Sequence, residues 1–350
     1  MGSETLKVAL LGCSRGPGEK HLEMWQAIEG AQVVLLAERA VELANQLARE
    51  HNIARVCHDF REAAVDTDID IVDIALPPRL HAEASVLALG AGHHVLCEKP
   101  MSPTLEEADR IVAALAGSDR VFAVHFQRRF TPIYDRITKL IEEGAIGRPV
   151  QWRYVMADGS KDRAENTGYE GILQDCGIHN VDRASVVFGR PVRVQAIGMK
   201  LSHRPNLGEV DTGTLVVTYE DGDQMSVQMC NGLLRGITGA ESFEVLGPEG
   251  IIQYQPMANR VWSDNSKFTW TDRQRTTHTV HIEEDWRDWG RNSLGQHFVD
   301  CVRDPNKDRN PLCGAEQGRA MVLMNRAVEN SLNTGNAVDI EAFSRELVDA

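Results

Sequence analysis

Short apolar runs alternate with helix-forming stretches over roughly the first 125 residues. The apolar runs occupy residues 6–11, 32–36, 69–75, 95–97 and 121–126, and helix formers are concentrated at residues 40–50, 80–89 and 102–115. Strands covered on both faces are short and continuously apolar, and parallel strands need a crossover helix between them. The pattern therefore predicts an α/β domain with a parallel sheet. Pro103 is expected in the first turn of the helix over 102–115.

After residues 144–149 the pattern changes to strands in succession, at residues 150–155, 192–199, 213–219, 224–229 and 243–246. The turn-forming residues 220–223 join two alternating runs, which favours a hairpin and a mostly antiparallel, open sheet. Helical character returns at residues 293–302 and 316–332, before a short polar tail. We therefore predict an α/β domain over residues 1–125 and an α+β domain over residues 126–350.

The composition is typical of a globular protein with two domains. The chain has 350 residues, of which 42% are hydrophobic, enough to bury a substantial core. Its formal net charge of −14 disfavours nonspecific binding to nucleic acid or to anionic membranes. The local basic segment Gln127-Arg128-Arg129 could bind phosphate, but a solvated face is the commoner explanation for such a pair of arginines.

Cysteine usage and the absence of long apolar runs indicate a cytoplasmic protein. The seven cysteines are odd in number and scattered, and no paired C-x-x-C spacing suggests a structural metal. Reduced thiols are therefore expected. The amino-terminal residues lack a basic region followed by an apolar stretch, and no apolar run reaches membrane-spanning length.

The first predicted strand leads into a glycine-rich segment, Gly12-Cys13-Ser14-Arg15-Gly16-Pro17-Gly18. A Rossmann dinucleotide-binding domain has its glycine turn and the start of its first helix at this position. Small residues there let the backbone approach a pyrophosphate, whose charge the free N–H groups of the helix attract. The segment departs from G-x-G-x-x-G, because Ser14 replaces the middle glycine and one residue is added before Gly18. A glycine-rich surface turn explains this motif alone equally well.

An acidic residue follows the second predicted strand. Glu38 lies about twenty residues beyond the glycines, where a carboxylate that binds the adenosine ribose is expected. This carboxylate would repel a 2′-phosphate and favours NAD, although the adjacent Arg39 leaves NADP possible. The alternative is an ordinary acidic residue at a helix start.

Three motifs in chain order carry the most specific signal. Residues 91–101, AGHHVLCEKPM, are similar to a family element A-G-K-H-V-x-x-E-K-P, and residues 68–81 to D-x-V-x-I-x-T-P-P-x-x-H, with Leu76 where threonine is common. Residues 175–182, DCGIHNVD, reproduce D-x-G-x-H-x-x-D. The chain thus resembles the glucose–fructose oxidoreductase, inositol dehydrogenase and rhizopine-catabolism family, abbreviated Gfo/Idh/MocA. Its last ~150 residues match only in pattern, as a variable substrate domain would.

The resemblance implies a Rossmann domain, NAD or NADP as cofactor, no metal, and hydride transfer from a secondary hydroxyl of a sugar, glycoside or cyclitol. It also implies a homodimer or homotetramer formed through the open sheet of the second domain. The residues that it places at the cofactor are Gly12, Cys13, Ser14, Gly18, Glu38, Arg39, Leu76, Pro77, His81, Glu98, Lys99 and Gln127.

Oxidation of a secondary alcohol needs a base for the hydroxyl proton while the hydride leaves for the nicotinamide. His179 is the expected base, since histidine changes charge near neutral pH. Asp175 and Asp182 stand at i−4 and i+3 from it, on one face of an α-helix, and are expected to orient the ring and to bind substrate hydroxyls. Lys99 would stabilise the developing alkoxide. The alternatives are that Lys99 is a solvated loop lysine and that Asp175, His179 and Asp182 form an exposed polar stripe on a helix.

Two residues nearby bear on the same region. Gly177 lies in a helix interior, which makes sense if cofactor or substrate passes close to the backbone. Glu170 stands, with Tyr169, where the family often has glycines, and this added carboxylate is a candidate substrate contact.

Two rival functions stay open at this point. One is a glycosidase that uses bound NAD transiently, and the other is a sugar-sensing regulator built on the same scaffold. The regulator is disfavoured because Lys99, Asp175 and His179 are all present.

Overall fold

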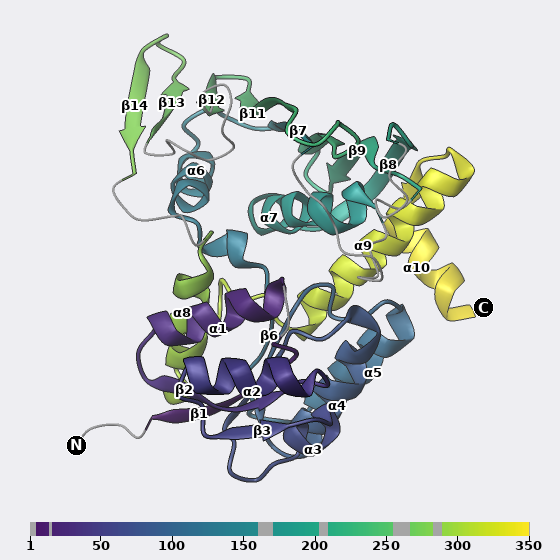
Figure 1. The fold of residues 1–350 in the computed structure, drawn as a ribbon. Helices are drawn as coiled ribbons and strands as arrows, with labels where there is room; N and C mark the ends of the chain where they lie inside the picture. The colour runs from purple at the N-terminus through teal and green to yellow at the C-terminus, as the bar shows by residue number, and fades with distance from the viewer. Residues whose placement is uncertain are drawn as a thin grey trace. The chain divides into compact units, whose positions relative to one another are not determined.

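The computed structural model describes residues 5–13, 16–159, 171–202, 209–254, 267–282 and 289–349. The chain divides into two compact units (Figure 1). The first comprises Met1–Phe130 and Arg287–Val322, and the second comprises Thr131–Trp286 and Leu323–Ala350. Neither unit is a single stretch of chain, because the segment 287–322 returns to the first unit.

The first unit is built on a parallel sheet, as predicted. Its described strands are β1 (Leu6–Leu11), β2 (Ala31–Ala37), β3 (Arg55–Cys57), β4 (Ile71–Ile74), β5 (His94–Cys97) and β6 (Phe122–Val124). They lie in the order β3-β2-β1-β4-β5-β6, and every neighbouring pair is parallel. The order reverses between β1 and β4, which is the switch point where such sheets bind ligands at their carboxyl edge. The three-residue strand β3 is too short for a hydrophobic pattern to reveal.

Helices connect these strands. They are α1 (Pro17–Ala27), α2 (Val41–Glu50), α3 (Phe60–Ala64), η1 (Pro78–Leu80), α4 (His81–Gly90), α5 (Leu105–Leu115) and η2 (Gln127–Phe130). The prediction that Pro103 lies in the first turn of α5 was wrong. Thr104 is the N-cap: its side chain accepts the Glu107 N–H, and the Glu107 carboxylate accepts the Thr104 N–H. This capping box starts the helix one residue after Thr104, so Pro103 precedes the cap.

Helix α8 (Arg291–Arg303) explains why residues 287–322 belong to the first unit. Its buried side chains Leu294, Phe298, Val299 and Cys301 recur at helical spacing and join the core formed by Leu22, Met24 and Trp25 of α1. The two helices approach closely at Gly295, where an added Cβ would lie 2.9 Å from Met24 Sδ. The boundary with the second unit falls within α9 (Ala315–Thr334).

The second unit is built on a mixed, mostly antiparallel sheet. Its described strands are β7 (Gln151–Asp158), β8 (Pro191–Met199), β9 (Thr212–Tyr219), β10 (Gln224–Cys230), β11 (Thr238–Gly247), β12 (Gly250–Tyr254), β13 (Lys267–Thr271), β14 (Thr277–His281) and β15 (Val338–Asp339). They lie in the order β14-β13-β12-β11-β7-β10-β9-β8-β15. Among these described strands only β7 and β10 pair in parallel.

One face of this sheet packs on α6 (Pro132–Glu142), the π-helical turn η3 (Leu173–Gly177) and α7 (Ile178–Phe188). Side chains alternate along the strands, and the inward ones form an aromatic cluster in which Trp152 contacts Tyr134, Phe188 and Phe243. The other face leaves Val155, Val216, Ile197 and Met199 exposed. The core of this unit therefore lies on the helix-covered face.

The expected polar tail after residue 332 is instead ordered structure. Val338 of β15 pairs with Val194 of β8, and α10 (Ile340–Asp349) follows. Ile340 and Phe343 are buried, and their apolar burial holds this end of the chain to the second unit. Two apolar residues three positions apart, such as Ile340 and Phe343, do not by themselves predict a packed helix in the sequence.

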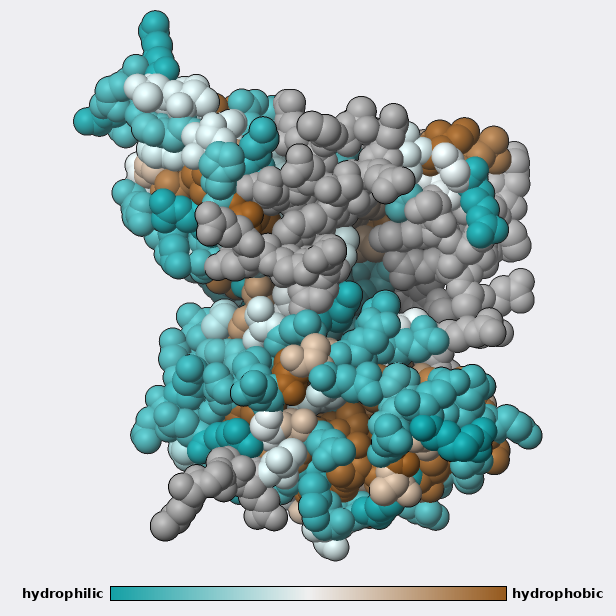
Figure 2. Space-filling view, turned by 60° about the vertical axis from the view of Figure 1, so that its left-hand side comes forward, coloured by the Kyte–Doolittle hydropathy of each residue, from teal (hydrophilic) through white to brown (hydrophobic). Residues whose placement is uncertain are grey.

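The described part of the chain contains no helix that is long and apolar enough to cross a membrane. The face drawn in Figure 2 is mainly hydrophilic, with hydrophobic areas between the polar side chains.

Candidate cofactor and catalytic sites

The glycine turn packs directly against the ends of two neighbouring strands. Gly12 has φ of +83°, its N–H donates to Ala37 O at 2.8 Å, and an added Cβ would lie 2.8 Å from Ala75 O. In the first turn of α1, a Cβ on Gly18 would lie 2.2 Å from Gly12 O. Both positions therefore require glycine, and α1 begins against the turn as in a pyrophosphate-binding loop. Ser14 lies outside the described residues.

Glu38 follows β2 at the same carboxyl edge. Its N–H donates to Cys57 O at 3.0 Å, and its carboxylate accepts the Ala40 N–H at 3.1 Å. Burial, and next the charge of Glu38, raise the pKa of the fully buried Cys13 thiol to about 12. The carboxylate therefore lies close enough to the glycine turn to act on it electrostatically. Arg39 is exposed beside it.

The loops after β4 and β5 are held together by His81. Its ring nitrogens lie 2.6 Å from Leu76 O and 2.7 Å from Pro100 O, and its side chain is buried. The ring thus joins the Leu76–Pro77 segment to the segment that contains Lys99. Both of these contacts are with backbone carbonyls, so the contribution of His81 to the predicted cofactor site is to position these loops.

A buried polar cluster, formed by His21, Trp25, Asp73, Glu98 and His125, lies beneath this edge. His21 Nδ1 lies 2.9 Å from both Asp73 oxygens, and Trp25 Nε1 donates to Asp73 at 2.6 Å. His21 Nε2 and His125 Nδ1 each lie 3.2 Å from Glu98 Oε1. Glu98 Oε2 accepts the Lys99 N–H at 2.8 Å, which connects the cluster to the predicted catalytic lysine.

Charge compensation decides the protonation of this cluster. Burial lowers the pKa of His21, but the Asp73 and Glu98 carboxylates outweigh it and raise that pKa to about 10. Burial would raise the pKa of Glu98, yet His125 and His21 hold it well below the usual range. For His125, burial and the charge of His21 lower the pKa. The two carboxylates therefore favour the protonated form of His21.

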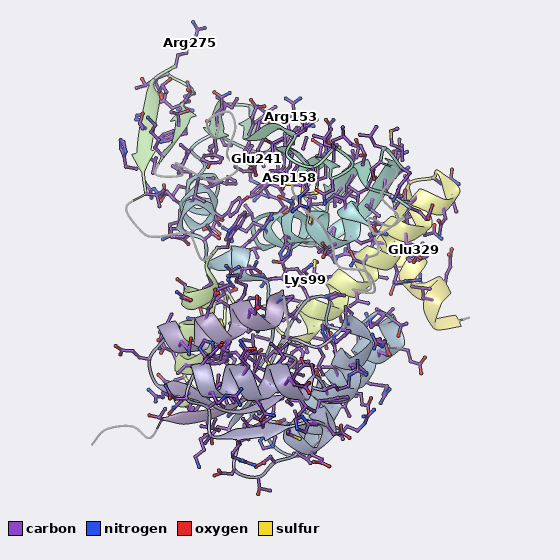
Figure 3. The ribbon with its side chains drawn as sticks, viewed as in Figure 1. Lys99, Arg153, Asp158, Glu241, Arg275 and Glu329 are labelled. Atoms are coloured by element: carbon purple, nitrogen blue, oxygen red, sulfur yellow. The ribbon has the colours of Figure 1, made fainter. Side chains whose placement is uncertain are left out.

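Lys99 follows β5 at the carboxyl edge of the parallel sheet, as predicted, and Figure 3 labels it there. Its side chain is half-buried, so the alternative of a fully solvated loop lysine does not fit. Gln127 begins the 3₁₀ turn η2 after β6 and is half-buried.

The expectation that Arg128 and Arg129 form a solvated face was wrong. Both are buried, at 8% and 5% exposure. Arg129 donates to Pro311 O, Leu312 O and the Gln317 side chain, and Arg128 stacks over the Trp289 ring. Both arginines instead fasten segments of 287–322, because buried guanidinium groups need many acceptors.

In the second unit, His179 and Asp182 lie within α7 and are buried, with 7% and 1% of their surfaces exposed. The alternative of an exposed polar stripe is therefore wrong for them. Asp175 lies in the π-helical turn η3, which has a wider turn than an α-helix. The backbone between Asp175 and His179 is therefore not purely α-helical, whereas His179 and Asp182 lie in the same α-helix at the predicted i+3 spacing. Single π turns are frequent at functional sites.

Gly177 joins η3 to α7 in ordinary helical conformation. The nearest atom to a Cβ added at this position would be Leu215 Cδ2, at 3.8 Å, an ordinary packing distance. Packing among the described residues therefore does not require a glycine here. Glu170 and Tyr169 lie outside the described residues.

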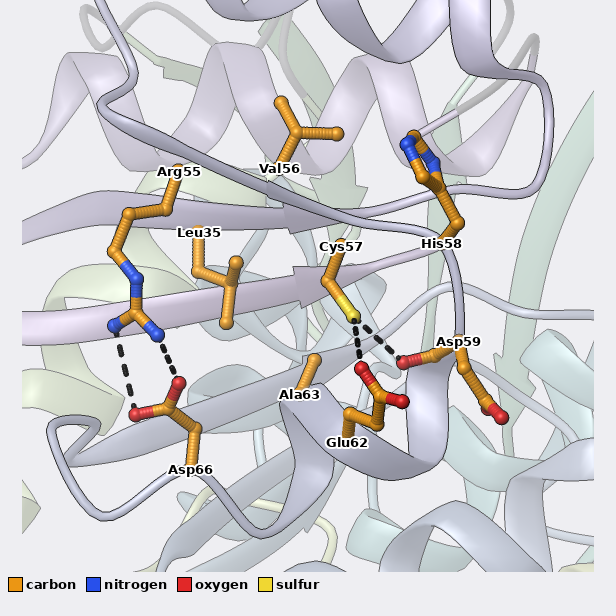
Figure 4. A pocket seen from close by; sticks show the side chains of 9 residues that line it. All are labelled: Leu35, Arg55, Val56, Cys57, His58, Asp59, Glu62, Ala63 and Asp66. Atoms are coloured by element: carbon orange, nitrogen blue, oxygen red, sulfur yellow. Dashed lines mark hydrogen bonds and ion pairs between the residues drawn. The ribbon is translucent and has the colours of Figure 1, made fainter.

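A separate open hollow of about 560 Å³ lies beside the edge strand β3 (Figure 4). Arg55 pairs with Asp66 on one side of it, and the Cys57 thiol faces Glu62 and the Asp59 carbonyl on the other. None of the predicted site residues lines it.

Sequence reasoning missed His21, Asp73 and His125. A signal was present, because Asp73 interrupts the apolar run 69–75 and His125 interrupts the run 121–126. A titratable residue inside a run that reads as a buried strand needs a buried partner.

Comparison with known protein families gives two matches. Residues 6–126 match the Gfo/Idh/MocA model described as an oxidoreductase family with an NAD-binding Rossmann fold, and residues 134–253 match a GFO/IDH/MocA C-terminal domain.

Several of the similar proteins are named as dehydrogenases. The chain is 24% identical to myo-inositol 2-dehydrogenase of Thermotoga maritima over 347 residues, 96% of this chain and 99% of that one. It is 31% identical to levoglucosan dehydrogenase of Pseudarthrobacter phenanthrenivorans over 249 residues, 63% of this chain and 64% of that one. A solved levoglucosan dehydrogenase in complex with NADH has the same fold, with a TM-score of 0.84, 24% identity and coverage of 96% and 99%.

Proposed function

Because this chain belongs to the Gfo/Idh/MocA oxidoreductases, whose first domain is an NAD-binding Rossmann fold, we propose that it oxidises a secondary hydroxyl of a sugar, glycoside or cyclitol and passes the hydride to NAD. The observation that carries the cofactor part is the carboxyl edge of the first sheet. The glycine turn, Glu38 and Lys99 all follow strands that end at this edge. The named dehydrogenases of inositol and levoglucosan support the substrate class.

The proposed roles follow from the chemistry. Lys99 stabilises the charge that develops on the reacting oxygen, and His179 accepts the hydroxyl proton. Asp175 supports the histidine, while Asp182 and Glu170 contact substrate hydroxyls. Bound NAD supplies the hydride acceptor, and the protein residues orient the substrate and move the proton.

A screen of cyclitols, aldoses and glycosides with NAD and with NADP tests this function. We expect net formation of reduced cofactor with at least one polyol. Turnover of a glycoside without net NADH would instead support the transient-oxidation glycosidase, and no turnover with any class would contradict an enzymatic role. We also propose that the protein works in the cytoplasm, because its seven scattered cysteines fit reduced thiols.

Preference for NAD over NADP is expected from Glu38, whose carboxylate at the end of β2 would repel a 2′-phosphate. The ratio of kcat/KM for the two cofactors measures it. Glu38→Ser should lower this ratio by roughly tenfold or more, equivalent to about 1.4 kcal/mol. Equal or better kcat/KM with NADP in the unmodified protein would contradict the assignment.

A further inference from the structure

We propose that His21, Glu98 and His125 of the buried polar cluster bind one late first-row divalent metal ion, of the Zn²⁺ type. This inference concerns the first unit alone and does not depend on the proposed dehydrogenase activity. The three residues come from α1, from the end of β5 and from the end of β6. Their separation along the chain, 77 residues between His21 and Glu98, hides the site from any search for short ligand spacings.

The distances match a metal site. One ligand atom from each of the three side chains lies within 4.8 Å of the other two. Glu98 Oε1 is 3.2 Å from His21 Nε2 and 3.2 Å from His125 Nδ1. Two atoms that each lie about 2.0–2.1 Å from a tetrahedral Zn²⁺ are about 3.3–3.4 Å apart. The two separations that involve Glu98 are therefore close to those around a bound ion, and the two histidine nitrogens lie within 4.8 Å of each other.

The surroundings of His21 prepare it as a ligand. Asp73 accepts from Nδ1, at 2.9 Å, and this holds a hydrogen on Nδ1, so that Nε2, which faces Glu98, is the nitrogen that can exchange its proton for a metal ion. A carboxylate that orients a metal-bound histidine in this way is the usual outer-shell arrangement at zinc sites. Trp25 holds the same carboxylate by donating to Asp73 Oδ2 at 2.6 Å.

His125 is the second, independent observation. Its side chain is 1% exposed, and among the described residues neither ring nitrogen makes a hydrogen bond with acceptable geometry. Its Nδ1 nevertheless lies against Glu98 Oε1. A buried imidazole without hydrogen bonds is costly, and a metal ion at Nδ1 would satisfy one of its two nitrogens.

The negative charge of the cluster also favours a bound cation. Asp73 is fully buried and the Glu98 side chain is 15% exposed, so the cluster contains two carboxylates that are largely shielded from bulk water. A divalent ion bound by two neutral histidines balances both charges. Two histidines and one carboxylate leave a fourth position for water, and imidazole ligands suit Zn²⁺ and its neighbours better than Mg²⁺ or Ca²⁺.

The first experiment measures the metal directly. Tag-free full-length protein is stripped with a chelator and titrated with Zn²⁺ against a chromophoric competitor, and with Co²⁺ followed by its visible absorption. We expect one ion per chain and a tetrahedral Co²⁺ spectrum. A wild-type chain that fails to bind one equivalent of either ion would overturn the proposal.

Substitutions locate the ion. His125→Asn and Glu98→Gln should abolish one-to-one binding, and Glu98→Gln keeps both the size of the side chain and an acceptor for the Lys99 N–H. Asp73→Asn should weaken binding by about 10- to 100-fold, the usual effect of losing an outer-shell partner. His51→Ala is the matched control, because this histidine at the end of α2 bonds to Gln26 outside the cluster.

Thermal unfolding of the stripped proteins checks that each variant is folded, since only variants that unfold cooperatively enter the comparison. Unchanged affinity in both His125→Asn and Glu98→Gln would contradict the site, and so would an equal loss of affinity in His51→Ala.

Discussion

A substitution at Gly177 can distinguish whether packing or function requires a glycine at this position. Because a Cβ there meets only ordinary contacts, Gly177→Ala should leave stability unchanged or raise it by up to about 1 kcal/mol. If cofactor or substrate passes along this backbone, kcat/KM should fall by at least about tenfold, equivalent to about 1.4 kcal/mol. Thermal unfolding and steady-state kinetics measure the two effects.

Gly90→Ala provides the control. Gly90 ends α4, and a Cβ on it meets nothing within 4 Å. This variant should keep its kinetics. A Gly177→Ala enzyme with normal kcat/KM would remove the functional explanation of this glycine.

The division of labour between His179 and Lys99 is also a prediction at the residue scale. His179→Ala should lower kcat for alcohol oxidation by roughly 10²–10⁴-fold, the loss expected for a missing general base, with little change in NAD affinity. The acidic limb of the pH–rate profile near neutrality should disappear, because a protonated histidine cannot accept the hydroxyl proton. Asp175→Asn should be milder.

Lys99→Ala should lower kcat while keeping that limb, since lysine stabilises charge rather than accepting the proton. The assignment would be reversed if His179→Ala kept both turnover and the limb while Lys99→Ala lost activity.

At the scale of single elements, strand β5 contributes a pH-sensitive contact. His94 Nδ1 accepts the Val121 N–H at 2.9 Å, and burial, followed by the charge of Arg120, lowers the pKa of His94 to about 4. The unfolded chain therefore binds the proton first. Stability should be full above pH ~6.5 and should fall towards pH 4 by on the order of 1–3 kcal/mol from this group.

Urea unfolding at pH 8 and at pH 4.5, in wild type and His94→Asn, isolates this contribution. Asparagine can still accept the Val121 N–H but does not titrate, so the variant should lose less stability on acidification. Identical pH dependence in the two proteins would exclude His94 as a contributor.

The elements that the sequence predicted well are those in which local pattern and tertiary packing agree. β1 was predicted to the residue, and β2, β7, β8, β9 and β10 to within three residues at each end, because strands buried on one or both faces have apolar runs or alternating residues. β11 begins five residues earlier than predicted. The capping box of α5 is visible in the sequence as Thr104-x-x-Glu107, and it, rather than Pro103, sets the start of the helix. The short strand β3, by contrast, has no hydrophobic pattern that would predict it, and it forms by pairing with its neighbour β2.

The candidate site divides in the same way. Motif spacing located Gly12, Glu38 and Lys99 at one sheet edge, because parallel strands end together. Spacing did not predict the π turn that contains Asp175, because residue spacing does not distinguish it from an α-helix, or the buried polar cluster, whose members meet only through the tertiary fold.

At the scale of the whole molecule, the open face of the second sheet is the expected oligomer interface. Ile197 and Met199 of β8 are 66% and 55% exposed, and Val216 of the adjacent β9 is exposed as well. Contiguous apolar surface of this kind is uncommon on monomers. We propose a homodimer or homotetramer, and sedimentation at micromolar concentration tests it.

Ile197→Lys should shift the protein to a smaller species without unfolding it, because the side chain already faces away from the core. Val65→Lys, at an exposed apolar residue of the first unit, should leave the assembly intact. A wild-type chain that sediments as a monomer would contradict the proposal.

The return of residues 287–322 to the first unit sets the order in which the molecule can be completed on the ribosome. When Phe130 emerges, Leu22, Met24 and Trp25 still lack Leu294, Phe298 and Val299, which cover them in the finished core. At 5–20 residues per second, synthesis of the ~170 residues from 131 to 299 takes roughly 8 to 34 seconds. The nascent dinucleotide-binding unit therefore spends that time with an uncovered apolar surface, and the first part of the chain to be made is among the last to be finished.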